Sequence, residues 1–198
     1  DVIGTSLALQ QASSVAAFVQ ATQGFVAPMQ NMVVADKAGH IGVVSPGRVP
    51  VRKPENDLKG LAPAPGWDAR YDWAGFVPAD ETPREQDPQR GYIVTANHRI
   101  TAAGYPHFIT SEWAAPYRAQ RIEQMIKAKA KLGMDDMAAM HADVKSLAAP
   151  ALLPWLLKAQ SAHTLAPAAL AALQGFDGSM AADKAAPLIY WAWQRQLA

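Results

Sequence analysis

The most informative stretch of this 198-residue chain, for both its fold and its function, is Gly91-Tyr92-Ile93-Val94-Thr95-Ala96-Asn97-His98-Arg99. Its first part, up to Ala96, is rich in β-branched and aromatic residues, which predicts a strand in the interior of a sheet. A polar cluster follows directly, and the Asn97 side chain is a neutral donor suited to a developing oxyanion. The alternative is an Asx-turn that only ends the strand, and the residues by themselves favour that alternative.

The residues before this stretch predict a β-rich region with one helix. Leu7–Leu9 is expected to be a short strand, and Ser13-Ser14 offers N-caps for a helix over Val15–Val19 that ends near Gly24. Met32–Ala35 and Ile41–Val44 are β-rich runs joined by a linker with a glycine, which predicts a hairpin.

The segment from Pro46 to Arg90 carries 8 of the 15 prolines and therefore excludes long helices. Its aromatic residues predict an ordered crossing loop with short strands that packs down onto the rest of the chain.

The residues after Trp113 predict a helical tail. Pro116 suits a first helical turn, Gly133 is expected to stop that helix, and Asp135 is expected to cap the next one. Further helical segments are expected over residues 152–159, 167–173 and 183–197. The fold class is therefore α+β, with a β-rich part over residues 1–113 and a helical region over residues 114–198.

Composition excludes several functions. A formal charge of +1 argues against an electrostatic nucleic-acid binder, and the absence of cysteine excludes thiolate metal sites and a Cys nucleophile. The five histidines form no close pair, and the chain has neither a Gly-x-Ser-x-Gly elbow nor a Gly-rich phosphate loop. No apolar run is long enough to span a membrane, so no membrane partner is expected.

Arg118 and Arg121 lie near the start of a predicted helix, where the helix dipole disfavours cations. At least one of the two should therefore bind an anionic or carbonyl-rich partner, and a structural salt bridge is the simpler alternative.

Several motifs across the chain carry a resemblance to one family. Besides Gly91–Arg99, they are Ala27–Asp36, Gly39–Gly42, Pro46–Pro50, Pro63–Trp67, Tyr105-Pro106, Trp113, Pro116–Ile122 and Leu173–Gly178. Together they resemble the penicillin acylase (penicillin amidase) family, with Phe176 standing where that family has Trp.

The resemblance implies an N-terminal-nucleophile hydrolase with an αββα sandwich, matured by self-cleavage into an α and a β subunit. The first β residue, usually Ser, attacks the amide carbonyl with its own α-amine as base. This chain begins at Asp1 without the family's Gly-Ser-Asn signature. We therefore expect an interior stretch of the β subunit that is inactive alone, self-associates when isolated, and belongs with an α subunit and the rest of β in the periplasm or outside the cell.

The resemblance also assigns site positions. Asn97 matches the oxyanion-hole Asn, and Arg121 matches the Arg that orients it, with Arg118 as the second candidate. Leu9, Met29 and Gln30 fall near the acyl pocket, where Leu9 in place of an aromatic would favour aliphatic acyl groups. No cofactor is expected for catalysis. A structural calcium ion is expected to use the carboxylate of Glu112 and the carbonyl of Gly60.

Two functions from different classes follow from the resemblance. The first is cleavage of the acyl amide bond of a small N-acylated substrate, either a β-lactam antibiotic or an acyl-homoserine lactone, through an acyl-enzyme. The second is a non-catalytic extracytoplasmic scaffold or interaction domain that kept the fold and lost the chemistry.

Overall fold

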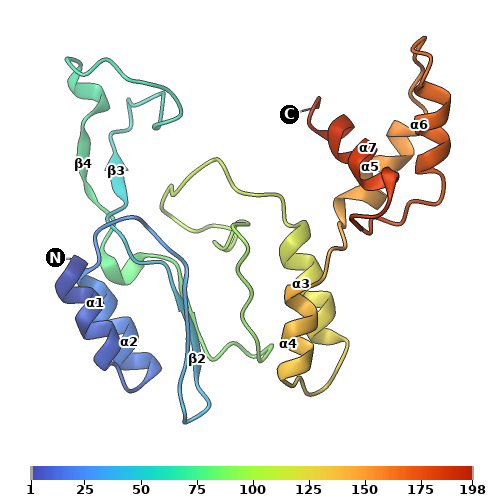
Figure 1. Ribbon diagram of the computed structural model, residues 1–198. Helices are drawn as coiled ribbons and strands as arrows, with labels where there is room; N and C mark the ends of the chain where they lie inside the picture. The colour runs from blue at the N-terminus through green and yellow to red at the C-terminus, as the bar shows by residue number, and fades with distance from the viewer. Residues whose placement is uncertain (1, 198) are drawn as a thin grey trace. The chain divides into compact units, whose positions relative to one another are not determined.

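The computed structural model describes residues 2–197, which form two compact units (Figure 1). The first unit runs to Thr95 and includes Arg99–Trp113, and the second comprises Ala96–His98 and the residues from Ala114 onward. Asp1, at which the expected interior stretch begins, lies outside the described residues.

The first unit combines short helices with two small sheets. In chain order its elements are α1 (Val2–Gln11), α2 (Val15–Ala21), the 3-10 turn η1 (Thr22–Gly24), β1 (Met32–Ala35), β2 (Ile41–Val44), β3 (Pro50–Arg52), η2 (Ala69–Tyr71), β4 (Trp73–Phe76), η3 (Ala79–Glu81) and β5 (Arg84–Gln86).

The first sheet is antiparallel, with strand order β1-β2-β5, and confirms the predicted hairpin. Val33 lies opposite Val43 in the hairpin, and Gly39 at its tip has a φ of +94°. α2 packs against β1 and β2, where a Cβ on Gly42 would lie 2.8 Å from the Val15 side chain. Val15 is fully buried, so this close approach of helix and strand forms the core of the unit.

The second sheet pairs β3 with β4 in the proline-rich segment and confirms the predicted short strands. The aromatic side chains expected to pack down onto the rest of the chain are mostly exposed, among them Trp67, Trp73 and Phe76. Arg52 lies opposite Trp73, and a β-bulge falls between Val51 and Arg52. A bulge changes the direction in which the following side chain points, which is important for the Arg52 guanidinium described below.

The strand expected at Leu7–Leu9 is wrong, because these residues belong to α1. A three-residue apolar run cannot distinguish a strand from a helix segment, and only the residues after it, Gln10 and Gln11, favour a helix. Tertiary packing then decides the outcome: α1 contacts η1, and Thr5 is buried where Gly24 leaves room for its hydroxyl. The helix expected after Ser14 is confirmed, since the Ser14 hydroxyl accepts a hydrogen bond from the Ala17 N–H at 3.1 Å.

The interior strand expected at Gly91–Ala96 is also wrong for the described residues, where this segment belongs to no sheet. A strand requires a neighbouring strand to satisfy its backbone groups. No strand of residues 2–197 pairs with this segment, although it remains mostly half-buried.

The second unit consists of helices. They are α3 (Tyr117–Lys127), α4 (Met134–His141), α5 (Ala148–Leu156), α6 (Ala166–Leu173) and α7 (Ala185–Gln194), of which α5, α6 and α7 lie together in Figure 1. Their core contains Ala149, Leu153, Leu156, Leu173 and Tyr190.

Several boundaries in the second unit differ from the prediction, and the helix expected over residues 152–159 is observed as α5, Ala148–Leu156. The first helix ends at Lys127, well before Gly133, and Gly133 instead is the N-cap of α4. The residue that satisfies this cap is Asp136, whose carboxylate accepts the Gly133 N–H at 2.9 Å, rather than Asp135. This hydrogen bond is the main cause that lowers the pKa of Asp136, and Lys129 adds to it.

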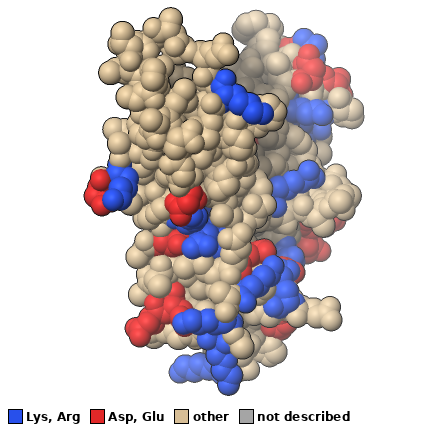
Figure 2. Space-filling view, turned by 90° about the vertical axis from the view of Figure 1, so that its right-hand side faces the viewer, with Lys and Arg blue, Asp and Glu red and all other residues tan. Residues whose placement is uncertain are grey.

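Charged side chains of both signs are interspersed on the face shown in Figure 2, between wide areas of other residues. This pattern agrees with the near-neutral composition. None of the helices in residues 2–197 has the length and hydropathy of a membrane span.

Candidate functional site: an arginine-held asparagine

The Asn97 backbone has an uncommon conformation, with a φ of +63°. This left-handed region is costly for most residues, and Asn tolerates it better than other side chains do. The carbonyl oxygen of Asn97 accepts a hydrogen bond from the Ala114 N–H at 3.0 Å, which ties the segment to the residues just before α3. A backbone outlier that is held by surrounding contacts is a frequent property of functional sites.

The Arg118 side chain fixes the orientation of the Asn97 amide. Its Nη2 atom donates to the Ala96 carbonyl and to Asn97 Oδ1, both at 2.8 Å. Because a guanidinium can only donate, the amide oxygen must face Arg118 and the amide nitrogen must face away. Among residues 2–197 the Nδ2 group forms no hydrogen bond, so it is available to an acceptor from elsewhere.

Arg121, to which the family resemblance assigned the orienting role, forms a different contact. Its Nε and Nη2 atoms donate to the two oxygens of Asp143 at 2.9 and 2.6 Å, the forked geometry of a guanidinium–carboxylate pair. This hydrogen bonding lowers the pKa of Asp143 and raises that of Arg121. The salt bridge considered as the simpler alternative is thus present at Arg121, whereas the hydrogen bonds of Arg118 are accepted by carbonyl oxygens.

Next to Asn97, His98 carries a buried Nδ1 atom that has no hydrogen-bond partner in the described part of the chain.

The residue before Ala96, Thr95, belongs to the first unit and is held there by a hydrogen-bond network that sequence reasoning missed. The Ser45 hydroxyl donates to Asn31 Oδ1, and Asn31 Nδ2 donates to the Thr95 hydroxyl, each at 2.7 Å. Ser45 is fully buried, so the network is anchored in the core beside β2.

The three residues expected near an acyl pocket lie in the first unit. Leu9 is a half-buried residue of α1, Met29 is half-buried, and Gln30 is exposed. They do not line a cavity of about 320 Å³ in this unit, which is formed by residues that include Phe25, Gly47 and Phe76. Met29 does pack behind one wall, since a Cβ on Gly47 would lie 3.0 Å from the Met29 Cβ.

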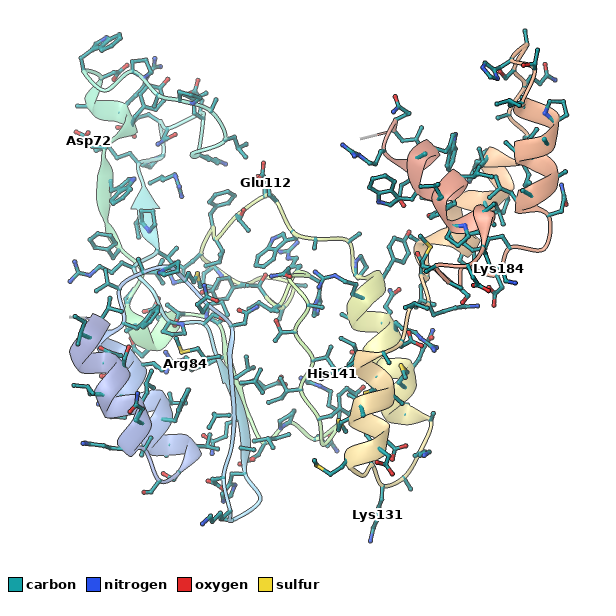
Figure 3. All side chains as sticks on the ribbon, viewed as in Figure 1. Asp72, Arg84, Glu112, Lys131, His141 and Lys184 are labelled. Carbon is teal, nitrogen blue, oxygen red and sulfur yellow. The ribbon has the colours of Figure 1, made fainter. Side chains whose placement is uncertain are left out.

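The residues expected to hold calcium do not form a ligand set by themselves. Glu112 is exposed and its side chain points outward (Figure 3), and the described residues contain no group of three His, Asp or Glu side chains that could hold a metal ion. A Cβ on Gly60 would lie 2.7 Å from Nη2 of Arg52, so a guanidinium is the neighbour of Gly60. Because a fixed positive charge repels a divalent cation, these surroundings do not fit calcium.

Comparison with known proteins defines the class. A model of the penicillin amidase family matches residues 1–198, so the chain belongs to this family and the resemblance seen in the motifs is confirmed. Penicillin acylase 2 proenzyme of Pseudomonas sp. (strain SE83) is 38% identical over 188 residues, which cover 94% of this chain and 24% of that protein. Acyl-homoserine lactone acylase QuiP of Pseudomonas aeruginosa is 40% identical over 139 residues, covering 70% of this chain and 16% of that protein.

A solved structure supports the fold. Thermostable penicillin G acylase from Alcaligenes faecalis matches with a TM-score of 0.67 and 24% identity, covering 89% of this chain and 33% of that chain. The chain spans about a quarter of the length of penicillin acylase 2 proenzyme, the first curated relative named above. The mixed α and β architecture is confirmed, and the αββα sandwich stays a prediction.

Proposed function

We propose that the protein containing this chain hydrolyses the acyl amide bond of a small N-acylated substrate. Support comes from its family and from relatives that are named as a penicillin acylase and as acyl-homoserine lactone acylases. The observation that carries the proposal is the Asn97 amide, whose oxygen is held by Arg118 and whose nitrogen forms no hydrogen bond among residues 2–197.

In this proposal Asn97 Nδ2 donates a hydrogen bond to the oxyanion that forms when a nucleophile attacks the amide carbonyl. Arg118 is a positioning residue, and by withdrawing electron density through Oδ1 it also makes the amide N–H a better donor. A donor that is already oriented needs no reorganisation as charge develops on the carbonyl oxygen. The nucleophile would come from another part of the protein, as the family resemblance implies.

The acyl group and the compartment are also proposed from the family. An N-acylated β-lactam or an acyl-homoserine lactone is the substrate class, and the αββα sandwich would be completed by an α subunit and the rest of the β subunit. The periplasm or the cell exterior is the expected location.

The proposal is tested on the full-length protein by incubation with phenylacetyl and long-chain acyl amides. Mass spectrometry should detect a free acid and a free amine, and it should show that the protein has matured into two chains. An unprocessed protein that releases neither product from any of these amides would contradict the proposal and support the non-catalytic scaffold.

A further inference from the structure

A second candidate site lies in the first unit, at the cavity of about 280 Å³ between β3 and the residues around Phe108. Its lining combines apolar residues, including Val77, Pro106 and Phe108, with three cations, Arg52, Lys53 and Lys59. No Asp or Glu is among the lining residues, so every charged side chain that lines the cavity is a cation.

The Arg52 side chain lines this cavity and provides one of its three cations. It leaves β3 at the β-bulge, and its guanidinium lies 5.6 Å from the centre of the Phe108 ring. Its Nη1 atom is buried and has no hydrogen-bond partner among the described residues. A buried guanidinium N–H without an acceptor is costly, because it has lost water and gained nothing in return.

The Lys59 side chain comes to the same aromatic ring from a tight turn. Its Nζ lies 5.9 Å from the centre of the Phe108 ring. The turn from Leu58 to Leu61 is closed by a hydrogen bond of 2.9 Å, and its central residues Lys59 and Gly60 both have positive φ. For a lysine this conformation is strained, and it is held by the buried Asn56, whose side chain accepts the Lys59 N–H at 2.7 Å.

Two other charged groups near the cavity already have partners. Lys53 Nζ donates to the Ala69 carbonyl at 2.5 Å, and Asp57 accepts the Tyr71 hydroxyl at 3.1 Å. Among residues 2–197, the Arg52 guanidinium and the Lys59 ammonium form neither a hydrogen bond nor an ion pair, and both lie over the Phe108 ring.

From this arrangement we infer that the cavity binds a carboxylate attached to an apolar stem. The carboxylate would pair with the Arg52 guanidinium and with Lys59, and the stem would lie against Phe108 and Pro106. A guanidinium matches a carboxylate because its N–H groups lie in one plane at a suitable spacing. The carboxylate comes either from a free small acid or from an acidic side chain of the full-length protein outside residues 2–197.

The experiment uses the full-length protein and follows its thermal unfolding midpoint with increasing sodium butyrate, with sodium chloride as the salt control. Arg52→Met is the test variant. Arg48→Met is the matched control, because Arg48 also lies over an aromatic ring, Phe76 at 5.5 Å, but outside this cavity. Because Lys59 is exposed, Lys59→Met serves as the test variant if Arg52→Met fails to fold.

If a free acid is the ligand, butyrate raises the midpoint of the wild type and of Arg48→Met above the chloride control, and Arg52→Met loses that rise. If an acidic side chain fills the cavity, butyrate has no effect. In that case Arg52→Met unfolds at a lower temperature than Arg48→Met at pH 7, and the gap closes as the pH falls below about 4, where carboxylates become protonated.

Two results would overturn the inference. One is a butyrate effect that survives in Arg52→Met. The other is the absence of any butyrate effect together with a gap between Arg52→Met and Arg48→Met that stays constant from pH 7 to pH 4, since contacts with Phe108 and Gly60 alone do not titrate in that range.

Discussion

Replacing Arg118 with Met tests how the Asn97 amide is oriented. Met keeps much of the length of the arginine side chain but cannot donate the two hydrogen bonds of 2.8 Å to Ala96 and Asn97. The Asn97 side chain itself is unchanged, but its amide can now rotate and present either its oxygen or its nitrogen to the substrate.

The expected size of the effect follows from these two contacts. An intramolecular hydrogen bond contributes about 0.5–1.5 kcal/mol net. If both contacts act on the transition state, the barrier rises by about 1–3 kcal/mol, which is about a 5- to 150-fold loss in kcat. The loss should stay below that of removing the donor itself, about 100- to 1000-fold. Because the amide acts mainly on the oxyanion, KM should change little.

The assay is steady-state hydrolysis of an acyl amide by the full-length protein, with thermal unfolding measured in parallel. Arg118→Lys should recover only part of kcat, because an ammonium is a point charge without the planar fork. Arg121→Met is the matched control: it breaks the pair with Asp143 and should lower stability more than kcat. The reasoning is refuted if Arg121→Met lowers kcat and Arg118→Met leaves it unchanged.

Three further predictions concern stability. Gly178→Ala should destabilise the protein by about 2 kcal/mol or more in urea unfolding, since φ is +90° and the new Cβ would meet the Ser146 carbonyl at 2.5 Å, whereas Gly66→Ala, with open space around it, should be neutral. Asp143→Asn should unfold at a lower temperature than the wild type at pH 7; because Arg121 lowers the folded-state pKa of Asp143, that difference should disappear as the pH falls through and below about 4, and a pH-independent difference would contradict the ion pair. Tyr190→Phe should leave the unfolding midpoint unchanged or raise it, because the buried Tyr190 hydroxyl has no partner among residues 2–197, and a clear decrease would reveal one.

Local signals in the sequence predicted local structure well. The hairpin around Gly39 and the cap at Ser14 depend on residues that are close in the chain, and the structure confirms both. The run at Leu7–Leu9 failed because packing against η1 made it helical. The segment before Asn97 was expected to be a strand, but a strand depends on a partner, and no described strand pairs with it.

The candidate site was predicted only in part. Asn97 follows from its motif, and its positive φ agrees with the Asx-turn alternative rather than with an uninterrupted strand. Arg118 and Arg121 lie three residues apart on one helix, and only the structure distinguishes the one that reaches Asn97 from the one that reaches Asp143. The cavity at Arg52 and Phe108 brings together residues that are distant in sequence, so spacing could not have revealed it.

The most direct test of Asn97 as the oxyanion donor is kcat of the Asn97→Asp variant of the full-length protein. Aspartate tolerates positive φ and keeps an oxygen for Arg118, so the fold and the unfolding midpoint should be retained. It replaces the N–H donor with an anionic oxygen that also repels the developing oxyanion, so kcat for acyl amide hydrolysis should fall by about 100-fold or more. A kcat within a few-fold of the wild type would contradict the account.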